Sequence, residues 1–266
     1  MRQPLMPAVA LSIAGSDSGG GAGVQADLKT FHAFGVFGTT AITAITAQNT
    51  LAVTAVHPVP PSLVEAQIRV VNEDLHPAAC KSGMLADAEI IRAVARALRE
   101  AAIPAYVLDP VMVATSGDPL LADSAVDSLR TELLPLSTLV TPNLQEAEIL
   151  AGMSVSDETG MRRAAERILS FGPPAVLIKG GHMHGDEVVD LLLTSSAERA
   201  WRADRLPVGN AHGTGCTLSA AIAAGLAMGQ ELEFAIDRAI RYTRHALETA
   251  PGLGSGATPL NHWAHP

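Results

Sequence analysis

The sequence predicts an open, mostly parallel α/β sheet with helices on both faces. Two observations predict the sheet and its helices. Short apolar runs bounded by turn residues alternate along the chain with longer stretches of helical periodicity. The chain has 266 residues, of which 48% are hydrophobic, and no repeat or charged linker divides it. We therefore expect residues 1–266 to form a single domain.

The predicted strands are short apolar runs, and the predicted helices repeat apolar residues every three to four positions. The strands are 9–13, 39–44, 79–83, 106–108, 139–141 and 176–179. The helices are 24–29, 89–99, 124–134, 160–170 and 218–228, the last composed almost entirely of Ala, Leu and Ile, as in a helix buried on most sides. Residues 191–193 and the region of Trp201 predict a further hairpin.

Composition excludes several classes of partner. The formal net charge is -9 and no run of Lys or Arg is present, so nucleic acid is not an expected partner. The two cysteines, Cys80 and Cys216, have no spacing typical of zinc sites or disulfides, which favours a reducing, cytoplasmic setting. The apolar stretch near the start is interrupted by prolines and is interpreted as a strand. No segment reaches the roughly 18 uninterrupted apolar residues of a membrane span.

A glycine-rich segment, 15–23, follows the first predicted strand and precedes a helical stretch. In open α/β sheets, ligands bind beyond the carboxyl ends of the strands. Glycines allow backbone N–H groups to approach a ligand closely, and a helix N-terminus favours negative charge. The segment matches neither the P-loop pattern nor a clean dinucleotide fingerprint. It predicts an anion-binding loop, with a plain turn as the alternative.

Three further motifs follow predicted strands. Asp109 can reach a metal ion and its phosphates, or it can cap a turn beside a proline. Asn143 and Glu146 either cap a helix or face Mg²⁺ and a triphosphate. Lys179, followed by two glycines, can hold a phosphate as a point charge, whereas His182 taken alone is expected to be structural.

The most informative motif, 212–219, opens the Ala-rich helix. Gly213, Thr214 and Gly215 predict successive backbone N–H groups that form an anion hole, into which the positive end of the helix dipole points. This environment predicts a lowered pKa for Cys216, which could then act as a base or hold a substrate hydroxyl. The alternative is a cysteine packed as a small hydrophobe, and the flanking glycines argue against it.

Taken together and in this order, the motifs resemble the ribokinase-type small-molecule kinases, whose signature is a G-T-G-D anion hole. Cysteine in place of that Asp, at 216, is similar to a narrower branch that includes the hydroxymethylpyrimidine/phosphomethylpyrimidine kinases and some pyridoxal kinases. Segments 13–30, 46–50, 81–85, 109–114 and 116–118 resemble the pyrimidine kinases, and the resemblance runs from about residue 8 to 250. Thr115 departs from it, since some relatives carry Lys there.

The resemblance implies an enzyme that uses ATP and Mg²⁺. Its implied activity is phosphorylation of 4-amino-5-hydroxymethyl-2-methylpyrimidine and then of the monophosphate to the pyrophosphate, in thiamine biosynthesis, by a homodimer. Implied substrate contacts are Ala14, Gly15, Asp27, Gln48, Met84, Val111 and Cys216, with the Gln48 amide reading the ring edge. The resemblance places Asp109 and Glu146 near Mg²⁺, Asn143 and Lys179 near the phosphates, and Thr214 with Gly213, Gly215 and Cys216 in the catalytic anion hole.

Two alternatives remain at this point. One is a pyridoxal kinase with a cysteine-bearing anion hole, against which Gln48 and Met84 favour the pyrimidine. The other is a catalytically idle pyrimidine sensor. Such a protein is expected to lack Asp109, Lys179 or Cys216, and all three are present.

Overall fold

The computed structural model of the chain describes residues 6–112, 125–181, 185–209 and 211–266. The sequence motif at 116–118, residues 113 and 114, Thr115 and His182 lie outside the described residues. Among the helices of the described ranges, none is both long enough and apolar enough to cross a membrane.

The predicted strands are confirmed and belong to one large sheet. Its strands are β1 (Val9–Asp17), β2 (Phe37–Gln48), β3 (Val53–Pro58), β4 (Ala79–Ser82), β5 (Ala105–Leu108), β6 (Leu139–Val140), β7 (Ala175–Ile178), β8 (Glu187–Thr194) and β9 (Glu198–Asp204). A separate two-stranded sheet pairs β10 (Ala211–His212) with β11 (Thr258–Pro259). The predicted hairpin is β8 and β9, which pair antiparallel.

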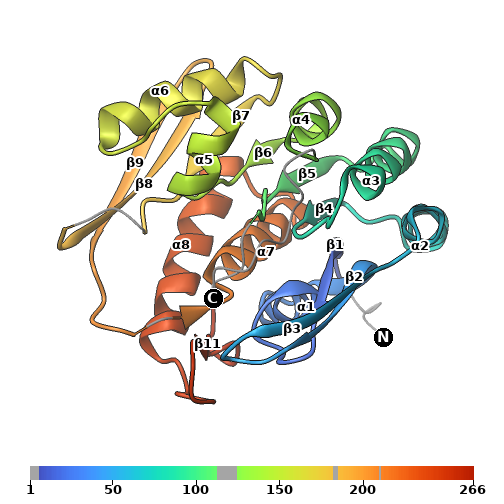
Figure 1. Cartoon of the computed structure of the whole chain (residues 1–266), viewed down its shortest axis with the longest axis horizontal. Coiled ribbons are helices and arrows are strands. Elements are labelled where there is room, and N and C mark those ends of the chain that lie inside the picture. The colour runs from blue at the N-terminus through green and yellow to red at the C-terminus, as the bar shows by residue number, and fades with distance from the viewer. Residues whose placement is uncertain (1–5, 113–124, 182–184, 210) are drawn as a thin grey trace, which may run out of the picture.

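The large sheet has the order β3-β2-β1-β4-β5-β6-β7-β8-β9 (Figure 1). The six neighbouring strands from β2 to β7 run parallel. The strands β3, β8 and β9 are antiparallel to their neighbours at the two edges. The prediction of a mostly parallel open sheet is therefore confirmed.

The helices are α1 (Gly23–Ala33), α2 (Pro61–Leu75), α3 (Ala88–Ala101), α4 (Val126–Ser128), α5 (Leu144–Ala151), α6 (Glu158–Leu169), α7 (Thr214–Ala227) and α8 (Leu232–Glu248). After α4 the chain continues as a π-helical turn, Leu129–Leu133, and a 3-10 turn, Leu134–Leu136. All five predicted helices are present, although α7 begins four residues earlier than predicted, at Thr214. The helices α2 and α8 and the strands β3, β10 and β11 were not predicted from the sequence.

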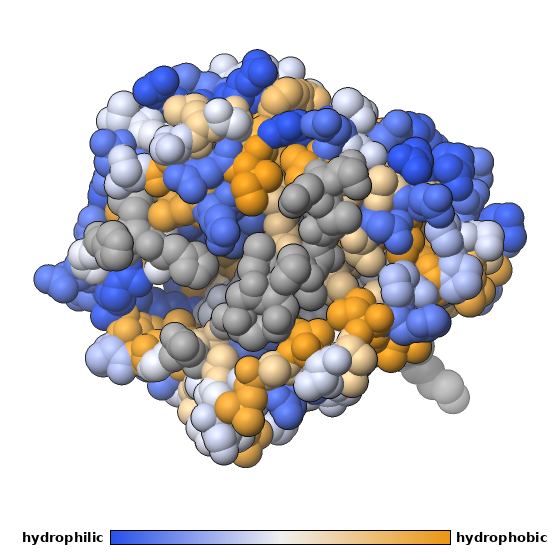
Figure 2. Space-filling view, viewed as in Figure 1, coloured by the Kyte–Doolittle hydropathy of each residue, from blue (hydrophilic) through white to orange (hydrophobic). Residues whose placement is uncertain are grey.

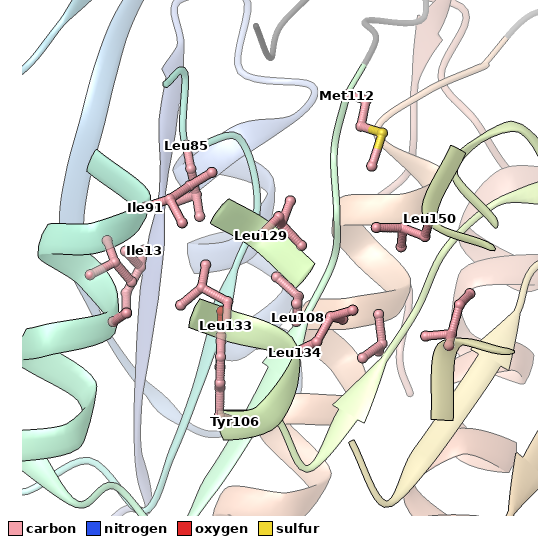
Figure 3. Close-up of a cluster of buried hydrophobic side chains, with 14 of the residues drawn as sticks. Ile13, Leu85, Ile91, Tyr106, Leu108, Met112, Leu129, Leu133, Leu134 and Leu150 are labelled. Atoms are coloured by element: carbon pink, nitrogen blue, oxygen red, sulfur yellow. The ribbon is translucent and has the colours of Figure 1, made fainter. Parts of the chain in front are cut away.

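Two hydrophobic layers cover the two faces of the sheet. On one face, α2, α3, α5 and α6 pack against side chains such as Ile13 and Leu108, and Figure 3 shows part of this cluster. On the other face, α1, α7 and α8 enclose the second cluster. Hydrophilic side chains gather over the outer helices α3 and α6 in Figure 2, as expected for helices with one buried face.

The Ala-rich sequence of α7 determines where this helix lies. Ala220, Ala221, Ala223 and Ala224 are fully buried, and α7 contacts both α8 and the strands β4 and β5. Small side chains allow a helix to approach a sheet and a second helix closely. As a result, the N-terminus of α7 lies near the carboxyl ends of the central strands, where the predicted motifs end.

Candidate active site

A cavity of about 1000 Å³ lies at the carboxyl ends of the parallel strands. Residues in the last part of β1 and β2 and residues after β1, β4, β5, β6 and β7 contribute to its walls, together with the start of α7. The sequence-predicted residues that line it are Ala14, Gly15, Gln48, Met84, Asp109, Val111, Asn143, Glu146, Lys179, Gly213, Thr214, Gly215 and Cys216. Their common location is as expected, and their roles in binding stay predictions.

Asp27 is the predicted site residue that the structure does not bring to the cavity wall. Its side chain is fully buried, where it accepts hydrogen bonds from the Lys81 ammonium at 3.1 Å to each oxygen. The hydroxyl of Ser12 donates to the same carboxylate at 2.5 Å. The structure gives this carboxylate the role of buried counter-ion of Lys81, and a direct substrate contact by Asp27 stays a prediction.

Lys81 is equally buried, and its ammonium lies directly beneath the cavity. A Cβ placed on Gly83, which lines the cavity, would lie 3.2 Å from Lys81 Nζ and 3.3 Å from Ala14 Cβ. Burial alone would lower the pKa of Lys81, but the adjacent Asp27 carboxylate raises it, so the side chain is held as a cation. The sequence signal for this residue was a lysine inside the short apolar strand β4, a position that requires a buried partner.

Two carboxylates and one ammonium form the most highly charged part of the wall. Lys179 Nζ donates to Asp109 Oδ1 at 2.8 Å and lies 3.9 Å from Glu146 Oε2. Asp109 also accepts from Thr141 at 3.3 Å and from Ser219 at 3.2 Å. Burial, assisted by the neighbouring Asp109 charge, raises the pKa of Glu146 to about 7, although Lys179 acts in the opposite direction. This cluster is therefore short of positive charge.

The interpretation of Asn143 and Glu146 as a helix cap is confirmed. Asn143 is the N-cap of α5 and accepts from the Glu146 backbone N–H at 2.9 Å, while Glu146 accepts from the Asn143 N–H at 2.7 Å. Both residues also line the cavity. The capping box fixes the Glu146 side chain beside Asp109 and Lys179, so the structural and functional interpretations are compatible.

The predicted anion-hole turn has the backbone that its glycines allow. Gly213 has φ +88°, in the left-handed region, and precedes the first residue of α7. A Cβ at this position would collide with the carbonyl oxygen of Gly21. A Cβ on Gly215 would lie 3.1 Å from Lys179 Nζ, so the glycine allows the start of α7 to approach the charged cluster closely.

The predicted lowering of the Cys216 pKa is wrong. Burial raises the pKa of this thiol to about 11, and the negative charges of Asp27 and Asp109 act in the same direction. The Lys81 cation and the backbone N–H of Gly23 lower the pKa, but they do not offset the burial. The sequence indicated the helix N-terminus correctly and did not show the two carboxylates on other segments.

The glycine-rich segment also differs from its prediction. Its first residues, Gly15 to Asp17, continue β1, because Asp17 still pairs with Thr46 of β2. The N–H groups of Gly19, Gly21 and Ala22 donate to the Asp17 carboxylate at 2.8 to 2.9 Å. The anion that these N–H groups bind is thus a side chain of the protein itself.

Asp17 connects the segment to two other parts of the wall. His212 Nε2 lies 3.0 Å from Asp17 Oδ2 and 2.9 Å from the side-chain amide of Gln48. Burial would raise the pKa of Asp17, but the hydrogen bonds from His212 and the loop N–H groups lower it. Sequence reasoning assigned no role to either residue, and no local pattern marks a contact between positions 195 residues apart.

The far end of the cavity has no predicted residue. Its wall comes from β9, the segment that follows it and α8, and includes Trp201, Leu206, Ile240, Arg244 and Leu247. Trp201 donates from its ring nitrogen to Asp237 at 3.2 Å, which holds the indole against α8. The mixture of apolar and basic side chains suits a flat ring attached to a phosphate chain.

The carboxyl edge of the parallel sheet carries a glycine turn at a helix N-terminus, and a lysine and two carboxylates lie opposite this turn. This is the arrangement of the ribokinase-like small-molecule kinases. The sequence profile of the phosphomethylpyrimidine kinase family matches residues 17–261, and the chain belongs to this family.

Relatives and a solved structure agree with this assignment. The chain is 52% identical to the hydroxymethylpyrimidine/phosphomethylpyrimidine kinase of Rhizobium meliloti, covering 97% of this chain and 98% of that protein. It is 46% identical to the thiamine biosynthesis bifunctional protein ThiED of Geobacter sulfurreducens, over 98% of this chain and 53% of that longer protein. The crystal structure of Bacillus subtilis pyridoxal kinase as an ADP complex superposes with a TM-score of 0.91 at 36% identity, covering 97% of this chain and 98% of that one.

Proposed function

We propose that this protein transfers the γ-phosphoryl group of ATP to the hydroxymethyl oxygen of 4-amino-5-hydroxymethyl-2-methylpyrimidine, and in a second reaction to the phosphate of the product. In the first reaction a bond forms between the hydroxymethyl oxygen and the γ-phosphorus, the bond to the ADP oxygen breaks, and the hydroxyl proton leaves. The observation that carries the proposal is the position of the Gly213–Cys216 turn, which lies against the Lys179–Asp109 pair inside one cavity.

The charged cluster marks the phosphate end of the site. Lys179 and Asn143 supply donors for the phosphates, and the turn at Gly213 to Gly215 supplies backbone N–H groups where charge develops. Positioning and electrostatic stabilisation contribute most of the catalysis in phosphoryl transfer. The adenine ring and ribose fit the far end of the cavity, beside Trp201 and Arg244.

The donors present suit a magnesium ion. Asp109 and Glu146 offer carboxylate oxygens, which Mg²⁺ prefers, and Mg²⁺ is commonly held by one or two carboxylates together with substrate phosphates. Burial and, after it, the neighbouring Asp109 charge raise the pKa of Glu146, and a further cation would relieve the repulsion between the two acids. When bound, the ion neutralises phosphate charge. Asp109 and Glu146 are the residues that would hold it.

The pyrimidine fits the opposite end, beside β1 and β2. Ala14, Gly15, Met84 and Val111 offer a small apolar surface, and Gln48 is a polar group on the wall. A Cβ on Gly15 would lie 3.0 Å from the Met84 sulfur, so the glycine keeps room for a flat ring. Cys216 lines the same cavity, one residue after the Gly215 that packs beside Lys179, and its proposed role is to hold the hydroxymethyl group and accept its proton.

The test is product identification with two substrates. The protein is incubated with Mg-ATP and either the hydroxymethylpyrimidine or pyridoxal. The products are separated and identified by mass spectrometry. We expect pyrimidine monophosphate followed by the pyrophosphate, with pyridoxal converted slowly. Preferential formation of pyridoxal phosphate would favour the alternative, which the likeness to the Bacillus subtilis enzyme supports. No product from either compound would contradict the proposal.

We also propose a homodimer. The strand β3 is an edge of the sheet, and large apolar side chains around it are exposed: Ile45 by 55%, Leu51 by 62% and Val56 by 42%. Contiguous exposed apolar side chains commonly mark a protein interface. Sedimentation equilibrium should give twice the chain mass, and Val56→Lys should shift the protein toward the monomer.

Two smaller proposals concern the cellular compartment and the number of domains. Both cysteines are free thiols, which suits a reducing cytoplasm. Residues 1–266 are proposed to act as one catalytic domain, because the cavity wall draws on elements from β1 to α8.

A further inference from the structure

His212 occupies a junction between three separate parts of the cavity wall. It lies in β10, directly before the Gly213 turn, and its side chain is 11% exposed. Its Nε2 atom is 3.0 Å from Asp17 Oδ2, at the end of β1, and 2.9 Å from the Gln48 amide, at the end of β2. A Cβ on Gly21 would lie 2.8 Å from the imidazole ring, so the glycine-rich segment also packs against it.

The proton on the imidazole decides which end of the Gln48 amide can face it. The Asp17 carboxylate accepts hydrogen bonds from three backbone N–H groups, and an ionised carboxylate has no proton to give. His212 Nε2 must therefore carry a hydrogen to approach Asp17 at 3.0 Å. A protonated Nε2 repels the NH₂ group of Gln48 and attracts its oxygen, which then shares the single Nε2 hydrogen with Asp17 in a three-centre bond.

A second neighbour of Gln48 leads independently to the same orientation. Thr46 Oγ1 lies 3.2 Å from the other end of the amide and also donates its single hydrogen to the Ser16 carbonyl at 2.9 Å. Having used that hydrogen, the hydroxyl can only accept from Gln48, which requires the amide nitrogen at this end. With nitrogen toward His212 and oxygen toward Thr46, neither contact is satisfied. Turning the amide by 180° lets Thr46 accept from the amide nitrogen and lets the Nε2 hydrogen be shared between Asp17 and the amide oxygen.

We propose that His212 is a positioning residue that fixes the Gln48 amide with its oxygen toward the imidazole, and that it thereby selects an aminopyrimidine over a pyridoxal-type ring. The inference rests on the proposed function for the identity of the ligand. The orientation itself follows from the hydrogen bonds of the protein alone.

The fixed amide has a defined donor and acceptor left for a ligand. Thr46 accepts from one N–H, and His212 donates to one lone pair of the oxygen. One N–H and one oxygen lone pair of the same amide group therefore remain for a ligand. An aminopyrimidine offers the complement on adjacent positions, a ring nitrogen that accepts and an amino group that donates. In pyridoxal, a methyl-bearing carbon separates the ring nitrogen from the ring hydroxyl. A site built for two hydrogen bonds discriminates strongly against a ring that cannot form both.

The orientation is tested directly by the proton on the imidazole. Long-range ¹H–¹⁵N spectra of the uniformly labelled protein distinguish protonated from unprotonated ring nitrogens, and loss of one signal set in His212→Gln assigns His212. We expect a protonated Nε2. An unprotonated Nε2 would overturn the proposal, because the amide nitrogen would then face the ring.

Selectivity is tested by calorimetric dissociation constants for the hydroxymethylpyrimidine and for pyridoxal. They are measured on the wild type, His212→Leu, Gln48→Ala and the double variant. His212→Leu should weaken pyrimidine binding roughly ten- to hundredfold and change pyridoxal binding less than threefold. In the Gln48→Ala background it should have almost no further effect, since His212 acts through Gln48. Multiplicative losses, or equal losses for both rings, would overturn the proposal.

A matched control is His262→Leu. This histidine is also buried and bonds to Thr217 at 3.0 Å, one residue beyond Cys216, and among the described residues no hydrogen bond joins it to Gln48. An equal change of selectivity in His262→Leu would count against His212. A wild-type protein that binds neither ring would contradict the proposed function, while the NMR spectra would still decide the orientation of Gln48.

Discussion

Lys81→Met should make the stability of the protein decrease as the pH rises. The side chain is fully buried and gives Asp27 its countercharge, with 3.1 Å between the ammonium nitrogen and each carboxylate oxygen. Methionine fills a similar volume without charge. Removing one partner of a buried ion pair leaves the other charge uncompensated, and Ser12 is then the remaining donor to Asp27.

The magnitude follows from the proton that Asp27 can take up. Burial raises the pKa of Asp27, and Lys81 is the largest influence in the opposite direction, so the variant should hold this carboxyl neutral. Because the ordinary pKa of an Asp carboxyl is 3.8, keeping Asp27 protonated in the folded variant costs about 4 kcal/mol at pH 7 and about 2 kcal/mol at pH 5. The folded state then binds one proton more than the unfolded state, so stability falls by about 1.4 kcal/mol per pH unit above the ordinary value.

Urea unfolding at pH 5, 6 and 7 measures this slope. The control is the double variant Asp27→Asn, Lys81→Met, in which no group is left to titrate, so its loss of stability relative to the wild type should be independent of pH. A Lys81→Met penalty that is equal at all three pH values would refute the reasoning. It would show that Asp27 stays ionised without its lysine.

Four further predictions address the rest of the site. Burial lowers the pKa of His262 to about 4, so the folded protein holds this imidazole neutral. The stability that results is fully present above pH 6.5, and about 3 kcal/mol of it is lost as the pH falls to 4. His262→Asn should remove this loss of stability at acid pH, measured by urea unfolding. Gly213→Ala forces a side chain onto Gly21 O at φ +88°, and kcat at saturating substrates should fall at least about 100-fold, whereas a normal kcat would exclude the anion hole. Asp109→Asn should raise the Mg²⁺ concentration for half-maximal rate, and an unchanged titration would remove Asp109 from the metal site. At pH 10, where about one thiol in ten is ionised, Cys216→Ser should lower kcat by roughly 10- to 10³-fold at unchanged ATP affinity, and near-normal turnover would exclude Cys216 as the base.

The sequence predicted those parts of the fold whose apolar pattern is strong. The central strands are continuous buried runs, and α7 is buried on most sides, so both are visible in the residue pattern. The missed strand β3 has no buried residue, and the missed helix α2 buries only Val64 and Ile68. Elements at an edge of the sheet bury too few side chains to produce a recognisable period.

The positions of the site residues were predictable from the sequence, whereas the chemical state of each side chain was not. Parallel strands bring the loops that follow them to one edge, so Asp109 and Lys179 had to lie near each other. The state of each side chain depends on partners from distant segments. Asp27 and Lys81 are 54 residues apart, and the pKa of Cys216 responds to charges on three other segments. No local pattern contains such contacts.

The raised pKa of Cys216 determines when this residue can act as a base. With a pKa of about 11, roughly one thiol in 10⁴ is ionised at pH 7. A positioned general base contributes roughly 10²- to 10⁴-fold, so at pH 7 the scarcity of thiolate cancels most of the gain. If the thiolate accepts the proton, kcat/KM should rise about tenfold per pH unit from 7 to 10, because kcat/KM reports groups of the free enzyme. Cys216→Ser should abolish that rise. A flat wild-type profile over the same range would show that a neutral thiol only holds the hydroxyl, and that the anion hole and Lys179 supply the catalysis without a base.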